Sequence, residues 1–167
     1  MKLSVLAIAA LSGAATLAAA PTAALAASYM ALSIDRTALV MTDLRAPRQI
    51  GGLAQTFELV VYRTPTKATG KPRGKTADYL IIEIDFDCAK GRQQQQYSAA
   101  YDAGGGFLSS DLKKPSWSKV APNTKEDALR NLGCQAAKPQ IGFPLGDVRV
   151  GKVLADYRAG LYDRYIR

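Results

Sequence analysis

Histidine is absent from the 167-residue chain, and cysteine occurs only twice. Without histidine, the Ser-His and Cys-His pairs that activate the nucleophile of many hydrolases cannot form. Two cysteines fall short of the roughly four nitrogen or sulfur ligands of an ordinary zinc site. The run Gly104-Gly105-Gly106 lacks the Lys-Ser/Thr pair of a phosphate-binding loop. We therefore expect a protein that is not an enzyme and has no metal site and no cofactor.

Long apolar runs occur only at the N-terminus. Lys2 precedes an apolar stretch, Leu3 to Leu17, and Ala24-Leu25-Ala26 has the A-x-A form of a cleavage site. This order predicts a secretory signal peptide over residues 1–26. A retained membrane anchor is the alternative, and it is disfavoured because the stretch is short and broken by Ser12-Gly13. The mature chain of 167 − 26 = 141 residues is expected to be one exported domain, periplasmic, secreted or at the cell surface.

Acidic residues are the scarcer charged type, with 14 Asp and Glu against 22 Lys and Arg and a net charge of +8. Lys2 is the only charged residue of the predicted signal peptide, so the mature chain carries 21 − 14 = +7. This positive net charge favours a protein or an anionic polymer as the partner outside the cytoplasm. The alternative is that the charge only keeps the protein soluble. Nucleic acid is not an expected partner of an exported chain whose basic loop, residues 63–75, has no interleaved aromatic array.

The two cysteines are predicted to form a disulfide. An exported protein folds in an oxidising compartment, where cysteines pair. The loop closed by Cys88 and Cys134 would span 134 − 88 = 46 positions. In the chain-entropy account, closing a loop of that length stabilises the fold by roughly 4 kcal/mol.

Alternation of apolar and other residues predicts extended structure through most of the mature chain. Short connections rich in turn residues separate these segments, as in an antiparallel sheet. A long polar loop is predicted over residues 64–75. About six strands are expected: Met30–Ile34, Ala38–Leu44, Gln55–Arg63, Asp78–Cys88, Gln93–Ala103 and Phe107–Leu112.

The strongest of these strands ends in the sequence EIDFDC, residues 83–88. Alternate residues of a strand share a face, so Cys88 lies on the apolar face and the carboxylates lie on the other. We interpret the carboxylates as a solvated acidic stripe beside Arg63 and Arg92. A cation site is disfavoured, because hard cations need about six oxygen ligands, and the carboxylate pair of a hydrolase is a weak alternative. The three carboxylates are Glu83, Asp85 and Asp87.

Helical signals occupy the C-terminal part of the chain. One helix is predicted to end at Gly133, just before Cys134, and to lie across the apolar face of the sheet. Residues 136–146 contain two prolines and are interpreted as a linker. Apolar residues at helical spacing predict a second, amphipathic helix from Asp147 to Ile166. Two capping pairs are open for the first helix: Thr124 with Asp127, or Asn123 with Glu126.

The order of several short motifs resembles the bacterial surface-adhesin protein E family. The motifs are the strand end Asp87-Cys88, the return strand Arg92 to Tyr97, Tyr101-Asp102 before the glycines, Trp117, Val120 to Thr124, and the helix that ends in Cys134. The N-terminal Tyr29 to Ile34 is also similar. The resemblance covers about residues 29–134, which divides the chain into a signal peptide (1–26), this domain (27–134) and a tail (135–167).

The resemblance implies an α+β fold, an antiparallel sheet with a C-terminal helix tethered to its concave face by the disulfide. It also implies that Trp117 is a core residue covering the end of the sheet. The named member of the family is a surface lipoprotein that binds host matrix and plasma proteins such as vitronectin and laminin. This chain departs from it in having no cysteine for a lipid near the predicted cleavage site, and in its tail.

No ligand contacts can be carried over from the family, so the candidate binding residues come from charge. Residues 63–75 hold five cations and no acid. A mobile basic loop of this kind can bind polyanions in a salt-dependent way, or can simply be solvated. The candidate cations are Arg63, Lys67, Lys71, Arg73 and Lys75.

The tail, residues 135–167, offers a second basic surface with three alternatives. It can lie on an anionic membrane, pack on a partner subunit in a homodimer, or pack on its own sheet. The favoured function is a non-enzymatic exported protein that binds extracellular protein or an anionic surface polymer. The alternative is a periplasmic structural or envelope-associated protein without an adhesin role, and a carboxylate-dependent hydrolase is less favoured.

Overall fold

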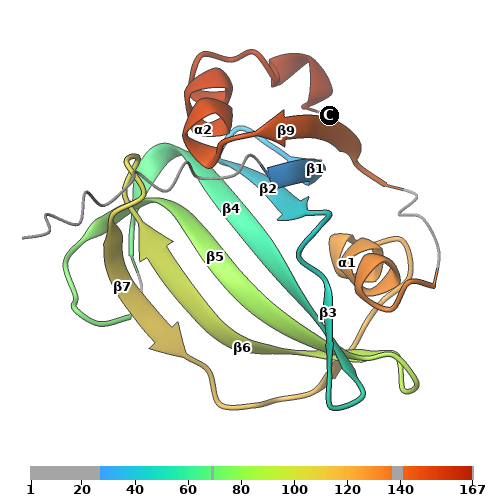
Figure 1. The fold of residues 1–167 in the computed structure, drawn as a ribbon. Helices are drawn as coiled ribbons and strands as arrows, with labels where there is room; N and C mark the ends of the chain where they lie inside the picture. The colour runs from blue at the N-terminus through green and yellow to red at the C-terminus, as the bar shows by residue number, and fades with distance from the viewer. Residues whose placement is uncertain (1–26, 69, 137–140, 167) are drawn as a thin grey trace, which may run out of the picture.

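The computed structural model describes residues 27–68, 70–136 and 141–166, so the predicted signal peptide lies outside the described residues. Figure 1 shows an antiparallel sheet accompanied by two α-helices, the α+β class that was expected. The strands are β1 (Ala27–Ile34), β2 (Ala38–Asp43), β3 (Arg48–Ile50), β4 (Leu53–Lys67), β5 (Thr76–Asp87), β6 (Arg92–Tyr101), β7 (Phe107–Leu112), β8 (Ser118–Lys119) and β9 (Phe143–Val148). The helices are α1 (Lys125–Gly133), α2 (Val150–Arg158) and the 3-10 helix η1 (Asp163–Tyr165).

The sheet has more strands than were predicted. Its strand order is β7-β6-β5-β4-β2-β1-β9, with β3 paired to β4 and β8 paired to β6. The predicted number of about six was wrong: β3, β8 and β9 bring the sheet to nine strands. β3 and β8 have only three and two residues, too few to show an alternating pattern. The predicted loop over residues 64–75 is also shorter, because β4 continues to Lys67.

β9 begins at Phe143, within residues 136–146 that were interpreted as a linker, and continues to Val148, into the start of the helix predicted from Asp147. It pairs with β1 at one edge of the sheet, with Pro144 opposite Met30. Proline lacks the N–H of a ladder bond, which an edge strand tolerates, and the β1–β9 register shifts between Tyr29 and Met30. The linker interpretation was therefore wrong for β9, because Pro144 and Gly146 are loop signals that this edge position accommodates.

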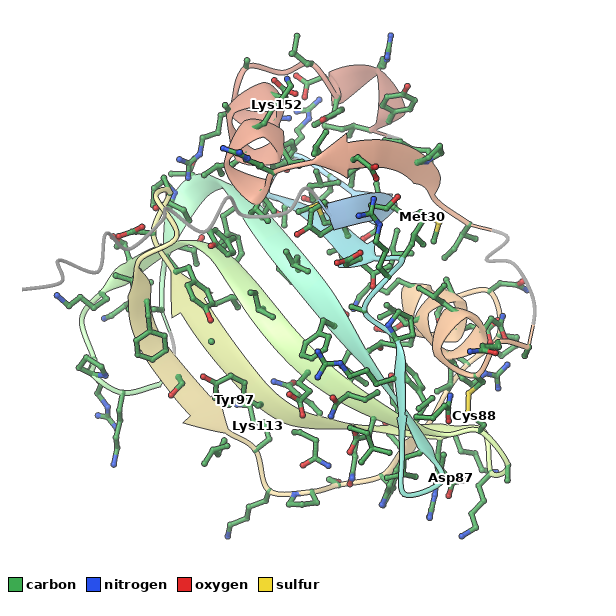
Figure 2. All side chains as sticks on the ribbon, viewed as in Figure 1. Met30, Asp87, Cys88, Tyr97, Lys113 and Lys152 are labelled. Carbon is green, nitrogen blue, oxygen red and sulfur yellow. A yellow bond between two sulfur atoms is a disulfide. The ribbon has the colours of Figure 1, made fainter. Side chains whose placement is uncertain are left out.

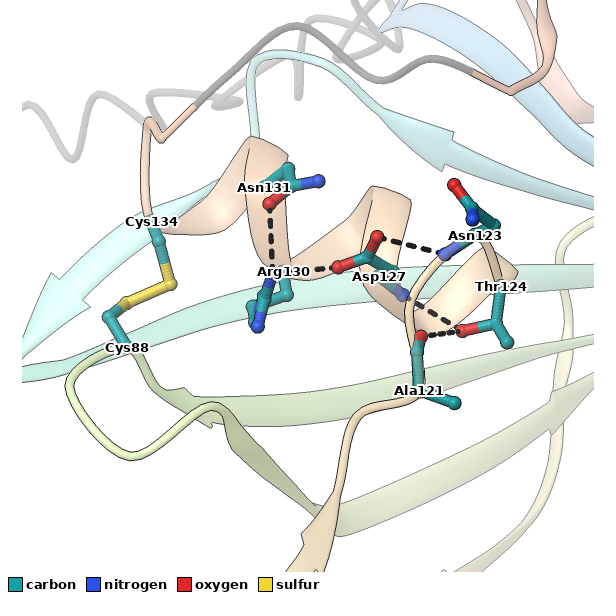
Figure 3. Close-up of polar contacts among 8 residues, drawn as sticks. All are labelled: Cys88, Ala121, Asn123, Thr124, Asp127, Arg130, Asn131 and Cys134. Carbon is teal, nitrogen blue, oxygen red and sulfur yellow. Dashed lines mark hydrogen bonds and ion pairs between the residues drawn. A yellow bond between two sulfur atoms is a disulfide. The ribbon is translucent and has the colours of Figure 1, made fainter.

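α1 packs on one face of the sheet, where the disulfide joins its end to β5 (Figure 3). The predicted Cys88–Cys134 bond is confirmed, with the two Cα atoms 5.8 Å apart. Thr124 and Asp127 form the cap, the Thr124 hydroxyl accepting the Asp127 N–H at 3.2 Å. The helix covers a small core made of Leu32, Ala54, Ile84, Phe86, Ala128 and Leu129.

α2 packs on the opposite face, which was expected to meet solvent or a partner. On β5, Ile84 joins the α1 core, whereas Tyr79 and Ile81, of opposite parity, join a second core under α2. Each face of the sheet therefore carries a helix, and the alternative in which the tail packs on its own sheet is confirmed. The second core contains Tyr29, Ala31, Leu39, Met41, Leu59, Val61, Tyr79, Val153, Leu154 and Tyr157.

α2 is shorter than the helix predicted from Asp147 to Ile166. It ends where Gly160 adopts a φ of 76°, in the left-handed region that glycine favours. The Gly160 N–H donates to the Tyr157 carbonyl at 3.1 Å, and the Leu161 N–H donates to the Asp156 carbonyl at 3.0 Å. These two bonds form a Schellman motif, which ends the helix and turns the chain back toward β4.

Gly133→Ala is expected to destabilise the protein by about 1–3 kcal/mol through overpacking. α1 approaches β4 so closely that a Cβ at Gly133 would lie 2.7 Å from Thr56 Cγ2 and 3.4 Å from Ala54 Cβ. Urea denaturation measures the loss. Gly151→Ala in α2, where the nearest atom to the new Cβ is 3.8 Å away, is the matched control and should be neutral or stabilising. Equal midpoints for the two variants would contradict the tight contact.

Candidate functional site

Arg63, the first of the five candidate cations, lies apart from the loop. It belongs to β4, its guanidinium pairs with the Asp163 carboxylate, and it lies 4.6 Å from the centre of the Tyr157 ring. The hydrogen bond from Arg63 is the main reason why the pKa of Asp163 falls below its ordinary value. The predicted place of Arg63 in a mobile loop is therefore corrected: this side chain holds the C-terminal segment on β4.

The loop that joins β4 to β5 is fixed against the edge strand β7. Lys71 and Ser110 exchange two backbone hydrogen bonds, each 3.1 Å long, so the loop extends the sheet beyond β7 at this point. An open hollow of about 610 Å³ lies between them, lined by Gly70, Lys71, Arg73, Ser110, Asp111 and Leu112. The loop that was expected to be mobile is thus anchored at Lys71, and two of its cations, Lys71 and Arg73, lie beside the edge of the sheet.

Four cations of this region have no anionic partner in the described part of the chain: Lys67, Lys71, Arg73 and Lys75. The nearby carboxylate of Asp111 is already engaged by the Lys113 ammonium at 2.5 Å. Figure 2 places Lys113 at the end of β7. Leu112, which is 79% exposed, adds an apolar contact beside the cations. We call the four cations and Leu112 the basic edge.

The carboxylates of β5 lie on the α2 face of the sheet, beyond the end that α2 covers. Asp85 is only 8% exposed and Glu83 is half-buried, so the prediction of a solvated stripe was wrong for Asp85. Gln96 Nε2 donates to Asp85 at 2.7 Å, and Gln55 Nε2 donates to Glu83 at 2.9 Å. The predicted cation Arg63 does not reach them, because it is bound to Asp163.

Of the three carboxylates Glu83, Asp85 and Asp87, Asp87 is the one with cationic partners among the described residues. The Arg92 guanidinium pairs with it at 3.0 Å, and Lys90 lies 3.7 Å away. Burial raises the pKa of Asp87, but the Lys90 N–H and Arg92 outweigh it and hold the pKa below its ordinary value. The same Arg92 guanidinium lies 4.6 Å from the centre of the Trp117 ring. Trp117 is half-buried and belongs to neither core, so the prediction that it is a core residue was wrong. Its ring instead lies beneath the Arg92 guanidinium.

A polar cavity of about 310 Å³ lies between α1 and the sheet. Its walls include Glu58, which is 4% exposed and accepts both contacts of the Lys125 ammonium at 2.9 Å. Burial lowers the pKa of Lys125, but the ion pair with Glu58 outweighs burial and raises the pKa above its ordinary value. A lysine held protonated in this way cannot serve as a general base, so the pair locks α1 to β4.

The residues that the structure describes contain no group of three or more His, Cys, Asp or Glu side chains placed to hold a metal ion. None of the described helices is both long and apolar enough to cross a membrane. The apolar side of α2, made of Val153, Leu154 and Tyr157, is occupied by the sheet.

Comparison of the chain with known protein families agrees with the motif order found in the sequence. The family model described as surface-adhesin protein E matches residues 29–135, which is more than half of the chain. Among the curated proteins and among the solved structures, none matches. The matched range includes the disulfide, α1, most of β1 and the strands from β2 to β8, and it ends before β9 and α2.

Proposed function

The chain belongs to the surface-adhesin protein E family, and from this premise we propose that it is an exported, non-enzymatic protein that binds an extracellular protein or an anionic surface polymer. The observation that carries the proposal is the basic edge. Its four cations have no anionic partner in the described part of the chain, and two of them, Lys71 and Arg73, line one hollow with Leu112.

The geometry of the basic edge suits an extended anionic ligand. Lys71 and Arg73 line the hollow beside β7, where Lys71 pairs with Ser110, and Lys67 lies at the end of β4, opposite Thr76. Leu112 offers an apolar contact in the same hollow, which a protein ligand can use and a plain polyanion cannot. Such a surface attracts anions over a distance of about 10 Å at moderate salt, and binding should weaken as salt rises.

Neutralising the loop with the triple variant Lys71→Ala, Arg73→Ala and Lys75→Ala is expected to weaken binding to heparin or to a matrix protein about 10- to 100-fold. The estimate takes up to ~1 kcal/mol for each exposed charge contact. Surface plasmon resonance at low and high salt, with a panel that includes vitronectin and laminin, measures the change. The matched control replaces Arg36, Arg149 and Arg164 by alanine, the same change in charge elsewhere on the surface.

Equal affinities of the two triple variants for every ligand of the panel would overturn the role of the basic edge. Location separates the adhesin role from the alternative of a periplasmic structural protein. An adhesin should be digested by protease added to intact cells, whereas a protein confined to the periplasm should be protected. Full protection, together with release by osmotic shock, would favour the structural alternative.

A further inference from the structure

The two edge strands of the sheet differ in how well they are blocked. β7 is the last strand on one side, and β9 is the last on the other (Figure 1). An edge strand presents unpaired N–H and C=O groups, which proteins commonly block with proline or lysine. β9 contains Pro144, whereas β7, with the sequence FLSSDL, has neither a proline nor a lysine. Of the two edges, β7 is therefore the one that can accept a further strand.

The backbone of β7 is paired at one point of this edge and free at the next. Ser110 directs both its N–H and its C=O outward, to Lys71 of the β4–β5 loop. Backbone groups alternate in direction along an antiparallel strand, and the Lys113 N–H accordingly points inward, to the Gln96 carbonyl at 3.0 Å. The N–H and C=O of Leu112 must then point outward, and no described residue bonds to them.

The free stretch of the edge opens into the hollow of about 610 Å³ beside the loop. Leu112, at 79% exposure, is the most exposed of the large apolar residues in the described chain. It lines the hollow together with Lys71 and Arg73, and the one carboxylate there, Asp111, is already neutralised by Lys113. The hollow thus combines free backbone groups, an apolar side chain and a net positive charge.

These three features distinguish between the possible ligands of the hollow. A sulfated or phosphorylated polymer can meet the cations, but it has no regular row of N–H and C=O groups and no apolar side chain for Leu112. A second copy of this chain would bring its own Lys71 and Arg73 to the same edge, where like charges repel. An extended peptide with acidic and apolar side chains can satisfy all three features, as in domains that bind a peptide by adding it to a sheet edge.

We propose that an extended acidic segment of a protein partner adds to β7 as a further strand at Leu112. Its carboxylates lie on Lys71 and Arg73, and an apolar side chain lies on Leu112. The proposal rests on the proposed function, because it specifies the class of ligand that the basic edge binds. In this mode main-chain hydrogen bonds supply the affinity, and the side chains of the added strand supply the specificity.

The test compares a peptide with a plain polyanion on the same protein. The hexapeptide Glu-Val-Glu-Val-Glu-Val and heparin are titrated separately into the mature protein and followed by calorimetry. Leu112→Ser should weaken the peptide about tenfold, because an apolar contact is lost, and should leave heparin unchanged. The matched control is Leu161→Ser, the same change at a leucine of the tail that is 59% exposed, and it should alter neither affinity.

Amide hydrogen exchange tests the pairing of the backbones. Binding of the hexapeptide should slow exchange of the outward Leu112 amide at least tenfold. The Lys113 amide, already bonded to β6, should change less and serves as the internal reference. The same hexapeptide with methyl groups on its backbone nitrogens cannot donate to the edge, so it should bind at least tenfold more weakly.

Equal peptide affinities of the Leu112→Ser and Leu161→Ser variants, or unchanged exchange of the Leu112 amide in the complex, would overturn the proposal. Binding of heparin without binding of the peptide would overturn it too, and would leave the proposed function intact. If the basic-edge triple variant bound both ligands as the wild type does, the proposed function would fail as well. A protein that is dimeric alone and monomeric after Leu112→Ser would also overturn the proposal, because a second copy would then occupy β7.

Discussion

Truncation after Ala136 is expected to abolish cooperative folding, although the deleted segment lies outside the range matched by the family. The deletion removes β9, which leaves one side of β1 without a partner strand, and it removes α2, which covers the larger core. Uncovered strands and an exposed apolar face favour aggregation over folding. The tail is therefore predicted to be part of the domain, not a separate appendage.

The expected loss is large because three α2 side chains are almost fully buried: Val153, Leu154 and Tyr157. Burial of each stabilises the fold by about 1.5–3 kcal/mol. Together they approach the net stability of a whole domain, which is about 5–15 kcal/mol. The loss of the β1–β9 hydrogen bonds adds to this, so little or no native structure should survive.

Thermal melts followed by circular dichroism and by amide NMR test the truncation. Two substitutions at Tyr157 measure how much of the loss of stability comes from this one α2 side chain. Tyr157→Ala should cost about 3–5 kcal/mol, whereas Tyr157→Phe should cost about 1 kcal/mol. The second loss is smaller because the ring stays and the Tyr157 hydroxyl is lost, with its 2.6 Å bond to the Asp35 carbonyl and its contact with Arg63. A truncated chain that melts cooperatively near the temperature of the full protein would show that α2 is dispensable.

Much of the sheet could be predicted from the sequence because the central strands alternate clearly. β4, β5 and β6 are long, and their apolar residues recur at every second position over enough residues to be recognised. The disulfide could also be predicted, because a chain that is expected to be exported and has two cysteines has one way to pair them. These features depend on local pattern or on simple counting.

β9 and the second core could not be predicted by the same reasoning. Pro144 and Gly146 end most strands, and only the edge position beside β1, a tertiary feature, makes them acceptable. The opposite face of β5 carries both apolar and acidic residues, so its pattern does not show that one half is buried. Tyr79 and Ile81 pack under α2, whereas Glu83 and Asp85 continue the same face without a helix above them.

The candidate sites, like β9 and the second core, depend on tertiary contacts that the local sequence pattern does not show. Because residues 63–75 were grouped by charge alone, Arg63 was predicted to act with the loop lysines. Its partner in the structure is Asp163, which is 100 positions away in the sequence. The burial of Asp85 depends on amides from two neighbouring strands, Gln55 on β4 and Gln96 on β6. A signal was present in the glutamine run after Arg92, since amides opposite carboxylates are the residues that allow such carboxylates to be buried.

Removal of the disulfide is expected to cause the second-largest loss of stability. The variant with Cys88→Ser and Cys134→Ser should unfold about 4 kcal/mol more easily, because the loop of 46 positions is no longer closed in the unfolded chain. The helix would then depend on Ala128 and Leu129 and on the ion pair of Lys125 with Glu58.

Urea denaturation of the double variant, and of the wild type with and without reductant, measures this loss. Reduced wild type and the double variant should unfold at the same urea concentration, well below that of the oxidised wild type. Proteolysis should cut first next to α1, because its small core cannot replace the covalent link that holds it to β5. Because the α1 core and the α2 core share no buried residue, detachment of α1 should leave the α2 core folded. Loss of all structure in one step on reduction would instead show that the two faces of the sheet fold as a single unit.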